Sequence, residues 1–196
     1  MRILISGGPG SGCTSTASAV GAVLDLPVFD SDSFFHKPTN PPFQQQYSPE
    51  ERRDLLKSAL TSRETWILSG SIATWGLPDF ISTHGVFLEI PHGERLKRLE
   101  ERQRTQFGAR IYPGGDMAEE HRSFLEWASG YESRTGAGRN LTTDRAFMES
   151  KCDHIMSISE VTPFQNLVAR VIGFLNEPPN AEQGGGGNSA ALHASP

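Results

Sequence analysis

The sequence has few cysteines and no long apolar run. Its two cysteines, Cys13 and Cys152, are too few for a disulfide framework and do not form a spaced set of metal ligands. No apolar run approaches the length of about 18 residues that crosses a bilayer, and the first residues lack the charged and apolar pattern of an export signal. We therefore expect a cytoplasmic protein with two free thiols and no membrane partner.

The chain also lacks an excess of positive charge. It contains 18 Lys and Arg against 23 Asp and Glu, which gives a net charge of -5. Because this balance provides no general attraction to polyanions, we predict no nucleic-acid partner. The His residues show no metal-ligand spacing. A polyphosphate ligand would therefore have to be held by a local cluster of donors.

Short apolar runs alternate with segments of helical periodicity. The runs that we interpret as buried strands cover residues 2–6, 26–30, 66–69, 86–90 and 154–158. This alternation predicts a parallel sheet with helices on both faces. Ser48, followed by Pro49 and Glu51, has the pattern of a helix start in which the hydroxyl and the carboxylate bind exposed amides reciprocally, and Thr162 begins a similar pattern.

Two regions interrupt this alternation. A Pro-rich and aromatic segment lies within residues 33–63, and a long insertion spans residues 107–151; we interpret both as mobile substrate covers. Apolar residues between 117 and 131 follow helical spacing, so part of the second region is expected to be folded. Residues 177–196 are rich in Gly, Pro and small polar side chains, which predicts a disordered tail.

A glycine-rich turn, GGPGSGCTST, directly follows the first apolar run. Glycines at this spacing between a strand and a helix let backbone amides surround phosphate oxygens, and the helix start adds its free amides and positive partial charge. The sequence therefore predicts a phosphate-binding loop, although a tight turn without a ligand is the alternative. The residues that we assign to nucleotide binding in this loop are Gly7, Gly8, Pro9, Gly10, Ser11, Gly12, Cys13, Thr14 and Ser15.

Cys13 stands where such loops carry a lysine that bridges the terminal phosphates. A thiol is shorter and mostly neutral, and a helix N-terminus would lower its pKa and create a negative charge in the wrong place. Cys13 therefore cannot do the work of the lysine. Either another cation reaches the loop, or catalysis is weak or absent. We interpret Cys13 as a small filler in preference to a redox switch.

The runs RILISGGPGSGCTST, PVFDSD and WILSGS together resemble the adenylate kinase and shikimate kinase group of small P-loop kinases. The likeness extends over about residues 1–175. It is closer to uncharacterised bacterial adenylate-kinase-like P-loop ATPases, some named topology modulation proteins, in which the loop has no lysine and runs similar to ARIYPGGDM and FLEWA occur.

This resemblance implies a P-loop NTPase fold, an α/β three-layer α/β/α sandwich with a five-stranded parallel sheet and a helical lid insertion. The kinase-like domain would span residues 1–176. Within it, residues 33–63 would form the substrate-binding insertion, and residues 107–151 would form the lid and its helical insertion.

The resemblance also implies roles for arginines. In the kinase group, arginines on the helix after the fourth strand contact adenine and phosphates, and the matching positions here are Arg98 and Arg102. We assign Arg98 to ATP binding and Arg102 and Arg110 to catalysis, with Arg139 as a further candidate, because a guanidinium grips two oxygens while staying charged. The alternative is a solvated helix, since Arg95 and its basic neighbours interleave with acidic residues at the spacing of i, i+4 pairs.

Asp30 and Asp32 follow the second strand, at the sheet edge where open parallel sheets place ligands. The resemblance favours catalytic roles for both, either binding a magnesium water or accepting a proton from an attacking hydroxyl. Turn or helix-capping aspartates are the alternative. Because the third strand ends without an acidic residue, Mg²⁺ would depend on Thr14, water and Asp30, while Asp116 is either a further acidic candidate or a helix cap.

These assignments predict an ATP-binding and Mg²⁺-dependent kinase that transfers the terminal phosphoryl group to a hydroxyl or phosphate acceptor. Its partners would be a nucleotide and a small-molecule acceptor, and it would act as a monomer or dimer. The alternative is a nucleotide-binding regulatory or interaction protein with little or no phosphotransfer, because Cys13 replaces the lysine. A guanidinium close to the space above Thr14 would favour catalysis.

Overall fold

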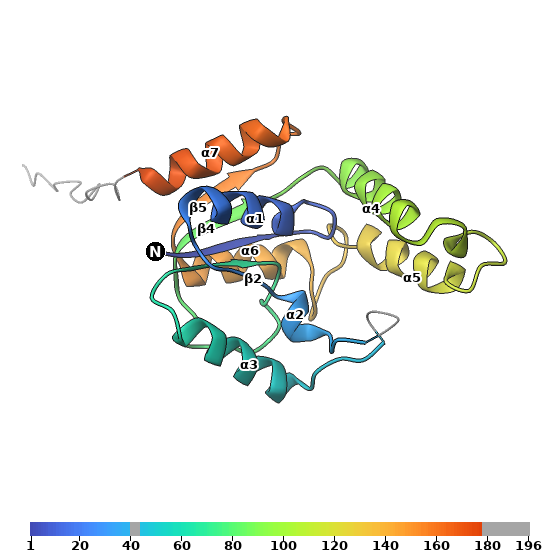
Figure 1. The fold of residues 1–196 in the computed structure, drawn as a ribbon, viewed down its shortest axis with the longest axis horizontal. Coiled ribbons are helices and arrows are strands. Elements are labelled where there is room, and N and C mark those ends of the chain that lie inside the picture. Colours follow the sequence, from blue (N-terminus) through green and yellow to red (C-terminus); the bar gives the residue numbers. More distant parts are fainter. Residues whose placement is uncertain (40–43, 178–196) are drawn as a thin grey trace, which may run out of the picture.

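A computed structural model describes residues 1–39 and 44–177 and has a five-stranded parallel sheet at its centre (Figure 1). The strand order is β2-β3-β1-β4-β5. The strands are β1 (Arg2–Gly7), β2 (Val28–Asp30), β3 (Trp66–Ser69), β4 (Ser82–Leu88) and β5 (Cys152–Ile158). The sheet confirms the predicted fold class. The predicted tail, from residue 178 onward, and residues 40–43 of the first insertion lie outside the described residues.

Helices cover both faces of the sheet. They are α1 (Cys13–Leu24), α3 (Pro49–Thr61), α6 (Leu141–Lys151) and α7 (Phe164–Asn176). Side chains alternate along β1, so that Ile3 and Ile5 pack against α1 and α7, while Leu4 packs on the opposite side against α3 and α6. The three layers follow from strands that are apolar on both faces, as expected for a parallel sheet.

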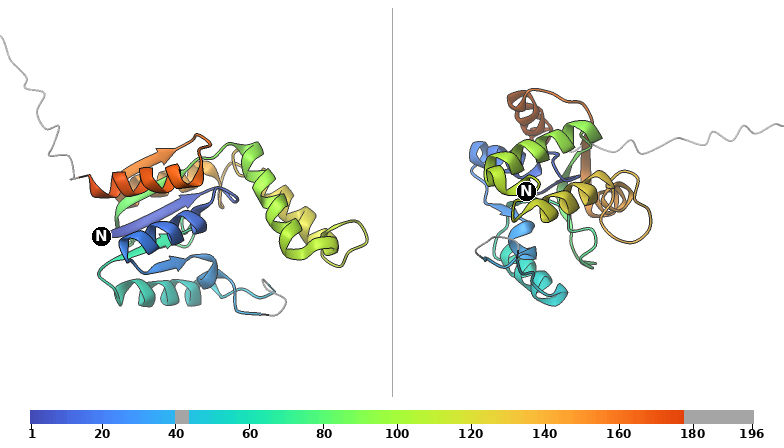
Figure 2. Two further views of the ribbon diagram at one scale, coloured as in Figure 1. Left: turned by 45° about the horizontal axis from the view of Figure 1, so that its top comes forward. Right: turned by 90° about the vertical axis from the view of Figure 1, so that its right-hand side faces the viewer.

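The other helices lie at the carboxyl edge of the sheet. They are α2 (Asp32–Phe35), α4 (His92–Phe107), the short 3-10 helix η1 (Gly108–Ile111) and α5 (Ala118–Ser129). Figure 2 shows α4 and α5 projecting beyond the sheet as an antiparallel pair. Residues 107–151 thus contain η1, α5 and α6; their action as a lid stays a prediction.

Several predicted boundaries differ from the structure. The second strand was expected from residue 26 and begins at Val28, and the fifth was expected from residue 154 and begins at Cys152. The fourth strand was expected at 86–90 but begins at Ser82. Its polar start is held by side chains: the Ser82 hydroxyl donates to Cys152 Sγ over 3.0 Å, and Thr83 Oγ1 donates to the Arg2 carbonyl over 2.9 Å. Apolar periodicity cannot reveal the start of a strand whose first residues are polar and form hydrogen bonds through their side chains. The α7 helix begins without a side-chain cap, so Thr162 does not have the predicted role.

No helix within the described ranges combines the length and apolar character that a membrane span needs.

The predicted capping box at the start of α3 is present. Ser48 Oγ accepts a hydrogen bond from the Glu51 amide over 3.2 Å, and Glu51 accepts one from the Ser48 amide over 2.7 Å.

We expect Ser48→Ala to lower the free energy of unfolding by about 1 kcal/mol, because an orphan amide loses its acceptor. Urea unfolding measures this difference. The control is Ser58→Ala, an exposed change on the same helix that should be neutral; equal effects of both changes would contradict the prediction.

Candidate functional site

The glycine-rich loop between β1 and α1 has backbone conformations that only glycine adopts easily. Gly10 and Gly12 have positive φ angles of 85° and 94°. Gly12 is the N-cap of α1, and no described side chain caps this helix, so its first amides remain available. A Cβ at Gly12 would meet only Arg98 Nη1, at 4.0 Å. The loop is therefore open on the side where a phosphate cradle needs space and donors.

On its other side, the loop is fixed by a buried arginine. Arg95 is 1% exposed, donates from Nη1 to the Pro9 carbonyl over 2.7 Å, and pairs with Glu132 through Nε and Nη2. Its guanidinium also lies over the Tyr131 ring, 5.2 Å from the centroid. A Cβ at Gly8 would approach Tyr131 Cδ1 to 2.7 Å. Arg95 is thus part of the loop's support, and its interpretation as a solvated helix residue was wrong.

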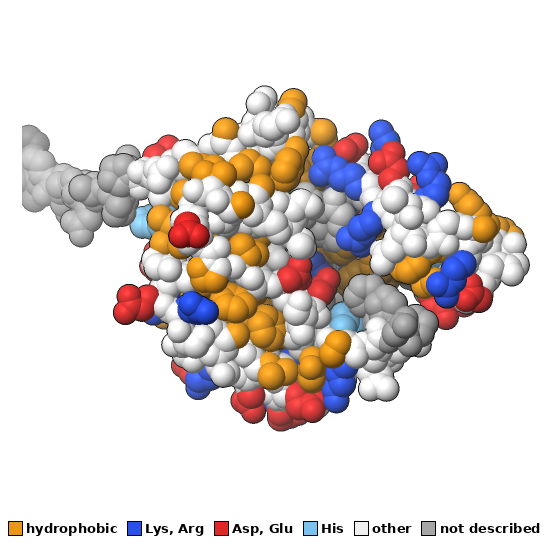
Figure 3. Space-filling model, in the orientation of Figure 1, with side chains coloured by type: hydrophobic (Ala, Val, Ile, Leu, Met, Phe, Trp, Pro, Cys, Tyr) orange, Lys and Arg blue, Asp and Glu red, His pale blue; other side chains and the backbone are white. Residues whose placement is uncertain are grey.

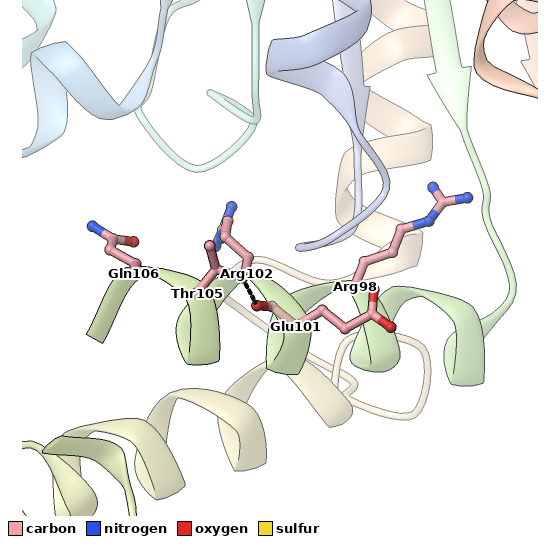
Figure 4. A pocket seen from close by; sticks show the side chains of 5 residues that line it. All are labelled: Arg98, Glu101, Arg102, Thr105 and Gln106. Carbon is pink, nitrogen blue, oxygen red and sulfur yellow. Dashed lines mark hydrogen bonds between the residues drawn. The ribbon is translucent and has the colours of Figure 1, made fainter. Parts of the chain in front are cut away.

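Arg98 and Arg102 extend from the same side of α4 (Figure 4). Arg98 Nε donates to Glu94 over 2.8 Å, as expected of an i, i+4 pair, and its Nη1 donates to the Ser11 carbonyl over 3.5 Å. Arg102 is exposed and forms no salt bridge with another described residue. An open groove of about 470 Å³ runs beside them, lined by Arg98, Glu101, Arg102, Thr105 and Gln106.

Arg110 lies away from these residues, in the 3-10 helix η1 between α4 and α5. Its guanidinium binds Asp116 through two donors, with Nε 2.9 Å from Oδ1 and Nη2 2.8 Å from Oδ2. Both side chains are exposed. The N-cap of α5 is Met117, so Asp116 pairs with Arg110 and does not cap this helix. The structure does not bring Arg110 to the loop.

The two predicted carboxylates lie at the end of β2 and the start of α2. Asp30 Oδ1 accepts a hydrogen bond from the Asp32 amide over 2.9 Å, so Asp30 does have the turn role that was its alternative. Asp32 is exposed, yet loss of hydration around its carboxylate raises its pKa, and the negative charge of Asp30 raises it further. Arg139, His36 and Arg102 oppose this rise. Asp32 therefore lies within electrostatic range of two arginines.

A buried polar network lies beneath the loop. Arg139 Nη2 donates to the Gly7 carbonyl over 3.0 Å, and its Nε lies 3.7 Å from Asp144 Oδ2. Asp144 is 1% exposed and accepts hydrogen bonds from Ser71 Oγ over 2.6 Å and from the Tyr131 hydroxyl over 2.9 Å. Burial raises the pKa of Asp144, whereas Arg139 and the two hydroxyl groups favour the charged form.

Sequence reasoning proposed Arg139 as a candidate but missed Asp144, Tyr131 and Ser71. One local signal was present: Asn140 caps α6 by accepting the Thr143 amide over 2.9 Å, which places Asp144 in the first helical turn. Acidic residues are common there because they complement the helix dipole, so this position alone did not indicate a buried role.

Cys13 is a neutral thiol in this setting. Its Sγ lies 3.2 Å from Ser11 Oγ, and burial raises its pKa to about 11, although the Ser11 hydroxyl and Arg139 act in the opposite direction. The expected lowering by the helix N-terminus is therefore outweighed by lost hydration. Cys13 and Cys152 are both free. A protonated thiol supports the interpretation of Cys13 as a small filler.

Charges of opposite sign face each other across the site. Figure 3 shows Lys and Arg side chains over α4 and Asp and Glu side chains near α2, on opposite sides of a hollow. No group of three or more His, Cys, Asp or Glu side chains that could hold a metal occurs within residues 1–39 and 44–177. A cation here would thus need ligands from water or substrate as well as protein.

The raised pKa predicts low reactivity of Cys13. A pKa near 11 in place of 9.0 leaves about a hundredth of the thiolate at pH 8, so alkylation by iodoacetamide should be roughly a hundredfold slower in the folded than in the urea-unfolded chain. Mass spectrometry of tryptic peptides separates Cys13 from Cys152. Fast modification of folded Cys13 would contradict the filler interpretation and favour the redox switch.

Comparisons with known proteins found a relative by sequence and solved structures with a similar fold. No family model matches the sequence. The chain is 30% identical over 178 residues to the uncharacterized protein YqaC of Bacillus subtilis, and the match covers 89% of this chain and 97% of that protein. The narrower resemblance to ATPases without the loop lysine stays a prediction.

Two solved structures are similar in fold. Shikimate kinase from Bacteroides thetaiotaomicron matches with a TM-score of 0.50 and 20% identity, over 90% of this chain and 99% of that chain. Deoxyadenosine kinase from M. mycoides, with nucleotide products bound, matches with a TM-score of 0.52 and 13% identity, over 90% and 99% of the two chains. At such identities the likeness shows the fold alone, which is that of P-loop kinases.

Proposed function

This chain belongs to the same family as YqaC of Bacillus subtilis, and we propose that it is an ATP-dependent phosphotransferase. The observation that carries the proposal is an open glycine-rich loop whose carbonyls are bound by arginines from elsewhere in the chain: Arg139 at Gly7, Arg95 at Pro9 and Arg98 at Ser11. A P-loop without any nearby cation would favour a binding protein over an enzyme. The kinase folds of the structural neighbours also support the proposal.

In this proposal, the amides of residues 8–15 hold the phosphates of ATP, and Arg98 contacts the nucleotide. Thr14 is exposed at the start of α1, and the carboxylate of Asp30 ends β2, so the site offers the oxygen ligands that Mg²⁺ prefers. Mg²⁺, when bound there, supplies positive charge that offsets the charge of the phosphates. Water and phosphate oxygens complete its ligands.

Phosphoryl transfer to a hydroxyl acceptor requires a base, and we assign this role to Asp32. The acceptor oxygen forms a bond to the terminal phosphorus, and the bond from this phosphorus to the bridging oxygen breaks with its electron pair staying on ADP. The acceptor proton passes to the Asp32 carboxylate. Arg102, which acts electrostatically on Asp32, stabilises the charge that develops, and Arg110 would join only after the α4–α5 segment moves.

The two insertions complete the proposal. Residues 33–63 bind the acceptor, and the projecting part of residues 107–151, η1 and α5, closes over the nucleotide so that water does not compete for the phosphoryl group. We place the protein in the cytoplasm, as a monomer or dimer. A hydroxyl acceptor uses the Asp32 base, whereas a phosphate acceptor would already be ionised and would need only positioning and positive charge.

Binding and transfer are tested separately. We expect saturating ATP with Mg²⁺ to raise the melting temperature by about 5 °C, because a ligand at a hundred times its Kd stabilises the folded state by about 2.7 kcal/mol. Product analysis over nucleosides, nucleotides and small alcohols then identifies the acceptor. No stabilisation by any nucleoside triphosphate would overturn the proposal, and stabilisation without any product would favour the regulatory alternative.

Asp32→Asn should lower kcat with a hydroxyl acceptor by roughly 100-fold or more while the Kd for ATP stays within about twofold, because only the proton acceptor is removed. The matched control is Asp54→Asn, an exposed carboxylate on α3. Steady-state kinetics and calorimetry provide the two readouts. Equal losses in the two variants would exclude Asp32 as the base.

The raised pKa of Asp32 also predicts the pH dependence of the reaction. A base must be ionised, so activity should fall as the pH drops through the pKa of Asp32, and this fall should begin at a higher pH than for an ordinary aspartate of pKa about 3.9. A profile of kcat/KM against pH measures the position of this limb. An acid limb at the ordinary position would contradict the assignment.

A further inference from the structure

We propose that Arg139 supplies the positive charge that the loop lacks at Cys13, and that Asp144 is the positioning residue that holds Arg139 there. This inference rests on the proposed function, because it assigns the group that binds the terminal phosphates of ATP. It gives the missing lysine a replacement from a different part of the chain, 126 positions further along.

The guanidinium of Arg139 lies at the start of the loop. Its Nη2 donates to the carbonyl of Gly7, which is the last residue of β1 and the first of the loop. Arg139 is also the cation whose charge acts on the half-buried thiol of Cys13. The positive charge therefore lies at the start of the loop and acts electrostatically on the position of the lysine, although it arrives from the connection before α6.

Most of the hydrogen-bonding capacity of Arg139 is unused. A guanidinium has five N–H donors, and within the described part of the chain one of them makes a hydrogen bond, to Gly7. Its Nε is buried without a hydrogen-bond partner among the described residues, and the side chain is 26% exposed. The Nη donors that make no hydrogen bond are therefore available to the oxygens of a tetrahedral anion such as phosphate.

Asp144 fixes the other side of this guanidinium. Its Oδ2 lies 3.7 Å from Arg139 Nε, while its two oxygens are held by Ser71 after β3 and by Tyr131 after α5. A carboxylate anchored by two hydroxyl donors has little freedom to move, so it keeps the arginine in one place. Tyr131 also packs on Gly8, which links this support to the loop itself.

Each of the other arginines near the loop has a different partner or role. Arg95 is buried and paired with Glu132, Arg98 is paired with Glu94, and Arg110 is paired with Asp116. Arg102 acts electrostatically on Asp32 on the acceptor side. Arg139 is therefore the arginine whose counter-ion, free donors and proximity to Cys13 together fit the role of the lysine.

The small size of Cys13 belongs to the same arrangement. A lysine at this position would bring a second cation toward Arg139, with the like charges repelling each other in a partly dehydrated site. A neutral thiol leaves this space to the guanidinium. The loop and the arginine are thus complementary, because the charge that a lysine would supply comes from residue 139 instead of residue 13.

The first test measures the Kd for ATP with Mg²⁺ by isothermal titration calorimetry. Arg139→Ala should weaken binding by at least tenfold, because a charge-assisted contact to phosphate is lost. The control is Arg170→Ala on α7, whose side chain is exposed and pairs with Glu160; its Kd should stay within twofold. A change below twofold in Arg139→Ala would overturn the inference.

The second test moves the charge back to the loop. Cys13→Lys in the natural background should not improve ATP binding, since it adds a cation next to Arg139. In the Arg139→Ala background the same change should recover at least half of the lost affinity on a logarithmic scale. Recovery also shows that the variant is folded. Improved binding by Cys13→Lys alone, or no recovery in a double variant with the natural melting temperature, would overturn the inference.

The role of Asp144 is tested by a double-mutant cycle with the near-isosteric change Asp144→Asn. If Asp144 acts through Arg139, this change weakens ATP binding severalfold in the natural background and has no effect once residue 139 is Ala. A purely structural role would cause the same loss in both backgrounds and would overturn the positioning assignment.

The outcomes separate this inference from the proposed function. If the unaltered protein does not bind ATP with Mg²⁺ at millimolar concentration, the proposed function fails, and the inference fails with it. If the unaltered protein binds ATP but none of the variants at residue 139 changes its Kd, the proposed function stands and only the inference is wrong.

Discussion

The contact between the glycine-rich loop and α4 is the constraint on which the candidate site depends. Arg95 is buried beneath the loop, binds the Pro9 carbonyl and is held by Glu132. Gly10 lies against the Arg95 carbonyl so closely that no Cβ fits between them. This packing fixes the loop from behind and leaves its front open, which preorganises the amides for an anion.

The positive charge at the loop comes from side chains outside it. Since the loop carries no cation of its own, positive charge reaches it from helix α4 on one side and from the connection before α6 on the other. Buried carboxylate Asp144 and exposed carboxylate Asp32 lie across from these arginines. The site is therefore assembled from segments far apart in the sequence, and the loop contributes backbone donors, hydroxyl groups and the Cys13 thiol but no cation.

Much of the fold could be predicted because its determinants are local. Apolar runs located all five strands, the capping residues around Ser48 located α3, and glycine spacing located the loop. The start of β4 was missed because Ser82 and its neighbours are polar and find partners on β1 and β5. In the candidate site, the alternative of a solvated helix does not hold for Arg95, whose helical spacing is identical to that of solvated arginines.

The sequence by itself determined the succession of strands and helices along the chain and the conformation of the glycine-rich loop. It also showed that this loop contains no lysine. Those properties depend on the periodicity of apolar side chains and on the backbone freedom of glycine, both of which act over a few residues. Only the tertiary structure decided which arginine meets the loop. The contact between Arg139 and Gly7 joins residues 132 positions apart. Which guanidinium is buried, paired or left with free donors depends on how helices pack on the sheet, and no local pattern encodes it.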